Sequence, residues 1–295
     1  MKSIIKQNNR KAAFTIVELL TVMSIIVILI GLLVPALNRV RIYASTVKQY
    51  AQFHSIEAAI ELFNNEFDGY PESSGLDPKG QPYCGAMKLC EAMMGLDLLG
   101  FHSNSIFDRD GEDKLGNLLY TTTDLSARKG PFLPPESADV FKMEDIYEPV
   151  VHVTDQGFLD TSLVLCDVYT RRLENGKKIG MPILYFKANT RARFHDPSKL
   201  GADEREPTDN IYNYWDNRRL VMLGKPDAQA SEHKFEVQGP ERFYRNTEHF
   251  QIQETTANDM PRPFRADSYI LMSAGYDGDY GTADDIYNFD WRYRD

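Results

Sequence analysis

The chain lacks the residue patterns that carry most enzyme chemistry. Its 3 cysteines include no CxxC pair, and its 6 histidines are scattered without an HExxH motif, which argues against a zinc site or a metalloprotease. It has no G-x-S-x-G elbow, no glycine-rich phosphate loop and no helix-turn-helix spacing. Hydrolase, nucleotide-binding and DNA-binding classes are therefore not indicated, and we expect a protein without catalytic residues.

Acidic residues outnumber basic residues outside the N-terminus. The chain carries 43 acidic and 33 basic residues, for a net charge of −10. The first 13 residues contain no acid and hold the basic residues Lys2, Lys6, Arg10 and Lys11, so the remainder is more acidic than the total. Such a body repels phosphate backbones, and we expect no nucleic-acid partner. It is compatible with binding a hard cation.

The cysteines are too few for a disulfide framework. Outside the cytoplasm, Cys84, Cys90 and Cys166 allow one bridge and leave one thiol. Cys84 and Cys90, in "CGAMKLC", form the nearest pair. The sequence leaves open whether they are bridged.

One long apolar run is present, from Phe14 to Val34. As a helix it spans about 31 Å, the hydrocarbon thickness of a bilayer. A secretory signal is the alternative, but no A-x-A cleavage site follows the run. Glu18 lies inside it, although a carboxylate in hydrocarbon costs roughly 2.5–3.5 kcal/mol.

The helical pattern continues after Pro35, where we expect a bend or a local loosening. Apolar residues recur at intervals of three and four, and polar residues such as Gln49 and Gln52 are expected on the other faces. The apolar positions are Val40, Tyr43, Val47, Tyr50, Phe53, Ile56, Ile60, Phe63 and Phe67. We predict one helix of about 80 Å over residues 14–68, ended by Asp68-Gly69-Tyr70-Pro71.

The segment "AFTIVELL", followed by an apolar run and a proline, resembles the type IV pilins and the pseudopilins of type II secretion. The resemblance implies that a prepilin peptidase cuts between Ala13 and Phe14 and that the new amino group is methylated. The residue before the cut is usually glycine in that family. Here it is Ala13, and slower processing is expected.

The same resemblance implies a role for Glu18 in assembly. Its carboxylate would pair with the Phe14 amine of a neighbouring subunit, so that the charge opposes insertion when alone and favours a filament when paired. A simpler alternative is a glutamate that reaches the lipid headgroups. The implied partners are like subunits, the prepilin peptidase and the secretion assembly platform.

The implied location is the bacterial inner membrane, crossed once, with the head in the periplasm. A pseudopilus subunit that supports protein export is the leading hypothesis. A type IV pilus subunit for adhesion, motility or DNA uptake is an alternative. A membrane-anchored extracytoplasmic enzyme or binding protein is another.

An acidic, glycine-rich stretch, "SAGYDGDYGTADDIYNFDW", covers residues 273–291. Calcium prefers six to eight oxygen ligands from such a tightly folded loop, whereas a solvated acidic loop is the simpler alternative. The stretch is similar to the C-terminal calcium loop of major pseudopilins. That resemblance implies side-chain ligands at Asp277, Asp284 and Asp285, and backbone ligands near Ala274 and Thr282. A second stretch, "DRDGED" at residues 108–113, lacks the glutamate that ends an EF-hand loop, and a solvated turn is expected.

The remaining sequence indicates an α+β fold. We expect a leader over residues 1–13, the long helix over 14–68 with its membrane span at 14–34, and a head over 69–295. In the head, a small antiparallel sheet with large loop insertions packs on the amphipathic half of the helix. A short helix is predicted at Met87–Leu99, and strands at Val150–Val153, Leu163–Tyr169, Ile183–Lys187, Leu220–Leu223 and Ser268–Ser273.

Overall fold

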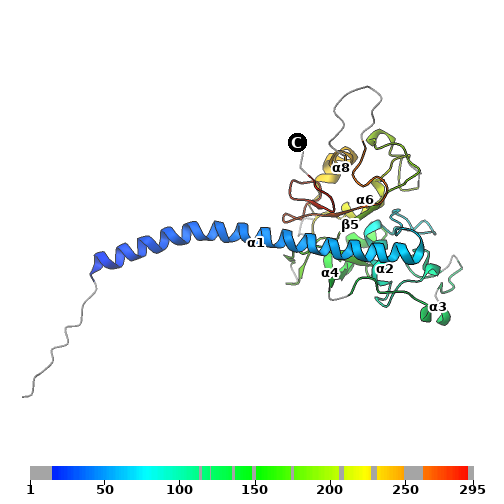
Figure 1. Cartoon of the computed structure of the whole chain (residues 1–295), viewed down its shortest axis with the longest axis horizontal. Coiled ribbons are helices and arrows are strands. Elements are labelled where there is room, and N and C mark those ends of the chain that lie inside the picture. Colours follow the sequence, from blue (N-terminus) through cyan, green and yellow to red (C-terminus); the bar gives the residue numbers. More distant parts are fainter. Residues whose placement is uncertain are drawn as a thin grey trace, which may run out of the picture. The chain divides into compact units, whose positions relative to one another are not determined.

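The structure is a computed structural model. It describes residues 15–112, 115–119, 121–134, 137–147, 151–173, 176–205, 209–226, 231–248 and 262–291. The chain divides into two compact units, one up to Ala44 and the other from Ser45 onward. A single helix, α1 (Ile16–Phe67), belongs to both (Figure 1).

The N-terminal unit, as described, is the first half of α1. Its large apolar side chains from Ile16 to Val34 are all exposed, and by length and composition the helix is able to cross a membrane, a test that a signal sequence also passes. The helix continues through Pro35 without interruption. It ends at Phe67, and Asp68 adopts a positive φ of 56°, so the predicted extent of the helix is confirmed to within two residues.

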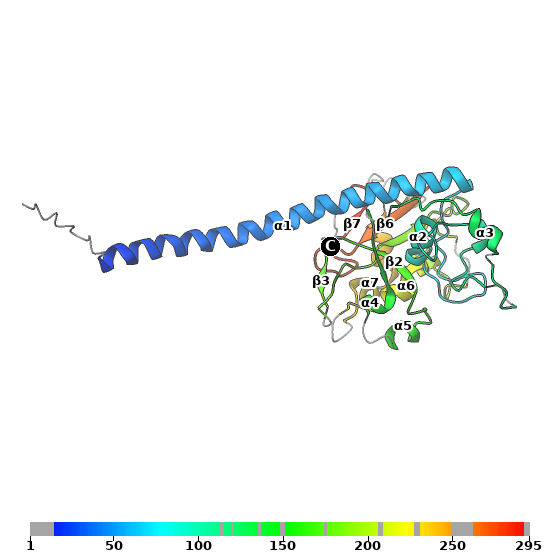
Figure 2. The same cartoon turned by 90° about the horizontal axis from the view of Figure 1, so that it is seen from below.

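The second unit contains short helices and three small antiparallel sheets that lie on one side of α1 from Ser45 onward (Figure 2). Its helices are α2 (Gly85–Met94), η1 (Ser103–Ser105), α3 (Thr122–Ser126), α4 (Met143–Ile146), α5 (Val151–Asp155), η3 (Pro197–Lys199), α6 (Trp215–Val221), α7 (Lys234–Gln238) and α8 (Pro240–Thr247). The strands are β1 (Asp139–Lys142), β2 (Leu163–Cys166), β3 (Arg171–Arg172), β4 (Lys178–Ile179), β5 (Leu184–Lys187), β6 (Tyr269–Ser273) and β7 (Ile286–Tyr287).

The three-stranded sheet, in the order β5-β6-β7, is buried on both faces. Side chains alternate along each strand, so Tyr185 and Leu271 pair on the face that packs with α1. Leu184 and Met272 pair on the opposite face, within a second apolar cluster. The sheet therefore separates two hydrophobic cores, and the predicted α+β head on a long helix is confirmed.

The part of α1 in the second unit supplies one of these cores. Phe53, Ile56 and Ile60 are at most 1% exposed, and each stabilises the fold by about 1.5–3 kcal/mol through burial. Gln49 and Gln52 are also buried, contrary to the sequence-based expectation. The Gln52 side chain donates to the Cys166 carbonyl at 2.9 Å, and the Val168 N–H donates to Gln49 at 3.0 Å. These polar contacts fix the helix against the segment after β2.

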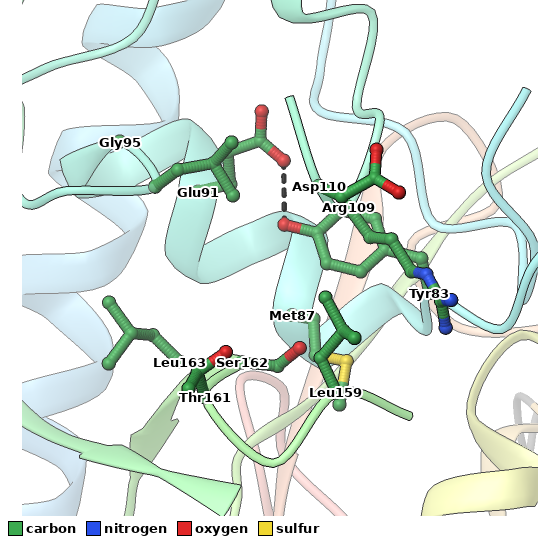
Figure 3. A pocket seen from close by; sticks show the side chains of 11 residues that line it. Tyr83, Met87, Glu91, Gly95, Arg109, Asp110, Leu159, Thr161, Ser162 and Leu163 are labelled. Atoms are coloured by element: carbon green, nitrogen blue, oxygen red, sulfur yellow. Dashed lines mark hydrogen bonds between the residues drawn. The ribbon is translucent and has the colours of Figure 1, made fainter. Parts of the chain in front are cut away.

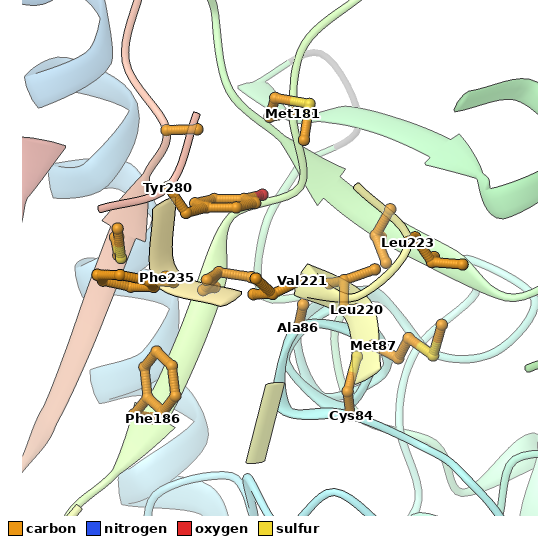
Figure 4. Packing of buried hydrophobic residues seen from close by; sticks show 14 of the residues in the cluster. Cys84, Ala86, Met87, Met181, Phe186, Leu220, Val221, Leu223, Phe235 and Tyr280 are labelled. Carbon is orange, nitrogen blue, oxygen red and sulfur yellow. The ribbon is translucent and has the colours of Figure 1, made fainter. Parts of the chain in front are cut away.

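The other core lies between α2, α6, α7 and the sheet (Figure 4). Cys84 belongs to this core, whereas Cys90 belongs to the core beneath α1. All three cysteines are described, and all are free and buried. The bridge considered between Cys84 and Cys90 is not formed in the structure: Cys84 directly precedes α2, Cys90 lies within it, and the two thiols enter different cores.

Two predicted strands are helices in the structure. The run expected as a strand at Val150–Val153 contributes to α5, and the run at Leu220–Leu223 contributes the end of α6. In α6 the buried residues are Asp216, Asn217, Leu220 and Val221, which are spaced as on one face of a helix. The prediction of a strand followed the apolar composition of residues 220–223 and missed this spacing. The strands near Leu163, Ile183 and Ser268 and the helix near Met87 are confirmed.

Candidate functional site

The N-terminus of α1 is capped by Thr15 and Glu18. The Thr15 N–H and hydroxyl both donate to Glu18 Oε2, at 2.9 and 2.8 Å. The Glu18 N–H donates back to Thr15 Oγ1 at 3.2 Å. This reciprocal arrangement is a capping box, which was not predicted from the sequence although the spacing T-x-x-E is its signature. Ala13 and Phe14, the predicted processing residues, lie outside the described residues.

The predicted calcium loop connects β6 to β7. The two strands pair antiparallel, with Ser273 opposite Ile286, so the stretch from Ala274 to Asp285 forms the connection of a hairpin. Gly275 has a φ of +64°, and a Cβ on it would lie 2.1 Å from the carbonyl oxygen of Asp284. Only glycine allows this approach, and it brings the two ends of the acidic loop together.

Two of the predicted ligands meet inside this loop. The Asp277 N–H donates to Asp284 Oδ2 at 2.9 Å, and the Thr282 hydroxyl donates to Asp284 Oδ1 at 2.6 Å. Burial, together with the neighbouring Asp284 carboxylate, raises the pKa of Asp277 to about 6. No lysine, arginine or histidine in the described part of the chain forms an ion pair with either carboxylate. These two carboxylates therefore have no ion-pair partner of their own among the described residues.

The third predicted ligand, Asp285, is buried. Its Oδ2 accepts the Gly281 N–H at 2.9 Å, whereas Oδ1 has no hydrogen-bond partner among the described residues. Burial raises the pKa of this carboxyl well above its usual range. A buried acceptor without a partner is unfavourable by about 1–3 kcal/mol. A cation would satisfy it.

The loop is held from outside by residues that the sequence did not identify. The Arg171 guanidinium donates to the carbonyls of Gly275 and Tyr276, at 3.1 and 3.4 Å. Asp279, which was not a predicted ligand, accepts from the Lys234 N–H at 2.8 Å and from Lys225 at 3.2 Å. The loop backbone is therefore held by Arg171 and Asp279 as well as by Asp277, whose Oδ1 accepts the Asp279 N–H at 2.8 Å, and by Asp284.

The donor set fits a hard cation in part. Among the described residues, no group of three or more acidic, histidine or cysteine side chains is placed to hold a metal by itself. Calcium also takes backbone carbonyl and hydroxyl oxygens. Asp277 and Asp284 adjoin each other, whereas Asp285 is not placed with them as a third acidic ligand, so a cation at the pair would need further oxygens such as those of Ala274 and Thr282.

The second acidic stretch differs from the predicted solvated turn. Asp108 is only 2% exposed, and its Oδ1 lies 3.0 Å from Lys79 Nζ. The same ammonium contacts Asp110 Oδ1 and donates to the Glu112 carbonyl at 3.0 Å. Three oxygens of the loop thus surround one lysine. This partner lies about 30 residues away in sequence, and no local pattern indicates it.

Comparison with known proteins gives no match. No family model, curated protein or solved structure matches this chain.

Proposed function

We propose that the chain is a pilin-like structural subunit of a type II secretion pseudopilus, anchored in the bacterial inner membrane and polymerised through α1. The observation that carries this proposal is the first half of α1. Its residues 16–34 expose apolar side chains around the whole circumference, and Glu18 is the one charged residue among them. A helix of this kind requires lipid or other helices around it.

In this proposal, Glu18 acts twice. Within one chain it closes the capping box with Thr15, which satisfies backbone N–H groups at the start of the helix. Cleavage before Phe14 creates an amine, and in the filament the amine of a neighbour pairs with the same carboxylate. Both Thr15 donors reach Oε2, so Oε1 is the atom proposed for this pairing. The pair would be favourable only in an assembly that excludes water.

The C-terminal loop supports the secretion assignment within this family. We propose calcium as its ligand, held by Asp277, Asp284 and Asp285 with backbone oxygens near Ala274 and Thr282. A bound cation would supply positive charge to the paired carboxylates and rigidify the β6–β7 hairpin. Its role is structural, and the prepilin peptidase, the assembly platform and further copies of the chain are the proposed partners.

Two variants separate the roles of Glu18 in a filament-assembly assay. Glu18→Gln keeps a side chain that closes a capping box but removes the charge, so we expect normal membrane insertion and a loss of assembly. Thr15→Val removes the capping hydroxyl and keeps the charge, so assembly should persist. Insertion is measured by membrane fractionation, and assembly by cross-linking between subunits. Normal assembly of Glu18→Gln would contradict the proposal.

A further inference from the structure

A cavity of about 510 Å³ in the head is lined by the segment of residues 72–74, by residues 187–191 at the end of β5, and by residues between 210 and 216. Much of its wall is polar. Asn189 and Asn213 each use Oδ1 to accept a backbone N–H at 3.1 Å, which leaves their side-chain N–H groups without a partner among the described residues. The volume is within the range of pockets that hold small molecules. The β6–β7 loop does not line this cavity.

An exposed serine of this cavity is in contact with a buried lysine. Ser74 lines the cavity and is exposed, whereas Lys88, on α2, is 2% exposed. The Lys88 Nζ donates to Ser74 Oγ at 2.7 Å and to the Leu76 carbonyl at 2.7 Å. A hydroxyl nucleophile, a base within hydrogen-bond reach and a third group that orients the base are the components of an activated serine.

No carboxylate in the described part of the chain forms an ion pair with Lys88. Two buried carboxyls near it are bound by hydroxyl groups instead: Asp216 accepts from Ser73, and Glu91 Oε2 accepts from Tyr83 at 2.6 Å, as Figure 3 shows. Burial lowers the pKa of the Lys88 ammonium, and the nearby carboxylates, chiefly Asp216, only partly oppose this. A lysine in such a site loses its proton more readily than one in water, as a general base must.

The backbone on both sides of Ser74 is held in place. A Cβ on Gly75 would lie 2.8 Å from the carbonyl oxygen of Trp215, so the chain packs here directly against the start of α6. The Gly75 carbonyl accepts the Tyr83 N–H at 3.0 Å. On the other side, Ser73 Oγ accepts the Lys187 N–H at 2.9 Å. Ser74 is therefore positioned between two fixed neighbours, as a reactive group must be.

We propose that Ser74 and Lys88 form a catalytic dyad that hydrolyses esters of short carboxylic acids with polar alcohols. Ser74 Oγ bonds to the acyl carbon while its proton passes to the neutral amine of Lys88. The bond from the acyl carbon to the alcohol oxygen breaks, and the alcohol leaves with the proton from Lys88. Water then cleaves the acyl-serine by the same proton transfers and releases the acid. The side-chain N–H groups of Asn189 and Asn213 favour an alcohol that carries further oxygen atoms.

Covalent labelling of the full-length chain in detergent micelles tests the nucleophile. A fluorophosphonate probe phosphonylates activated serine hydroxyls and releases fluoride, and tandem mass spectrometry should locate it on Ser74. Glycerol triacetate tests the ester class, and we expect the release of acetate. An unlabelled Ser74 would overturn the dyad. Labelling of Ser74 without release of acetate would overturn the proposed hydrolysis of such esters.

Variants separate the two roles. Ser74→Ala should abolish labelling and hydrolysis, whereas Ser126→Ala, at an exposed serine outside the cavity lining, should change neither. Lys88→Met removes the base, and Lys88→Arg keeps the charge on a group that does not give up its proton. Each should slow labelling by about 100-fold or more.

Thermal melting checks that each variant is folded. An unchanged labelling rate in a folded Lys88 variant would refute the dyad. If neither Lys88 variant folds, Ser74→Ala decides the question, and retention of hydrolysis in that variant would refute the proposal. None of these outcomes depends on filament assembly or on calcium.

Discussion

Two acidic loops of this chain differ in what neutralises them. At residues 108–112, the ammonium of Lys79 lies among the oxygens of Asp108, Asp110 and Glu112. At residues 274–285, Asp277 and Asp284 adjoin each other, and no described cationic side chain forms an ion pair with them. Lys79 neutralises the carboxylates of the first loop, whereas in the second loop Lys225 pairs with Asp279 and Arg171 contacts backbone carbonyls, and Asp277 and Asp284 have no ion pair of their own among the described residues. The comparison teaches that two acidic loops can differ in which carboxylates are neutralised because of one basic residue that is distant in sequence.

The largest expected effect is that of calcium on the second loop. At a free concentration 100 times the dissociation constant, a bound ion stabilises the folded state by about 2.7 kcal/mol. We therefore expect the melting temperature to fall when calcium is chelated. Asp277→Asn should lose this response, whereas Asp290→Asn, an exposed acid outside the proposed ligands, should keep it. If chelation left the melting temperature of the wild-type protein unchanged, the proposed calcium site would be refuted.

Substitution of Lys79, which neutralises the first loop, should lower the free energy of unfolding by a smaller amount, and this loss should not depend on calcium. Lys79→Met leaves Asp108 buried without its counter-charge, and we expect a loss of about 1–3 kcal/mol in the free energy of unfolding. Lys129→Met is the matched control, because the Lys129–Glu66 pair is exposed and should contribute less than about 1 kcal/mol. Urea unfolding in the presence of chelator measures both. Similar losses in the two variants would show that Lys79 is an ordinary surface lysine.

The smallest expected effect is a pH dependence of the calcium-free second loop. The pKa of Asp277 rises from 3.8 to about 6 on folding, through burial and the proximity of Asp284. Its contribution to stability is therefore complete below about pH 3.8 and is lost as the pH rises through about 6. Other buried carboxyls also titrate, so the measured quantity is the difference in unfolding free energy between wild type and Asp277→Asn in chelator. Relative to the variant, the wild type should be more stable at about pH 5 than at about pH 7.5. The opposite sign would contradict the assigned proximity of Asp277 and Asp284.

Sequence reasoning succeeded where the signal was periodic or local. The length and end of α1 follow from apolar spacing and from Asp68-Gly69. The hairpin was not predicted, because its second strand, β7, has only two residues. Sequence reasoning also failed where a long-range contact decides the outcome. Lys79 reaches Asp108, and Gln52 reaches the Cys166 carbonyl, across separations that no motif encodes. The end of α6 was predicted as a strand from its residue propensities. In the structure it is a helix, because burial against the rest of the head overrides propensity there.

The most direct test of the pilin-like account is the mass of the N-terminus of the protein isolated from membranes. Intact mass and tandem mass spectrometry would identify the first residue and its modification. The account predicts a mature chain that begins with N-methylated Phe14 and retains Glu18. A chain that still begins at Met1, or one cut beyond Pro35, would contradict it.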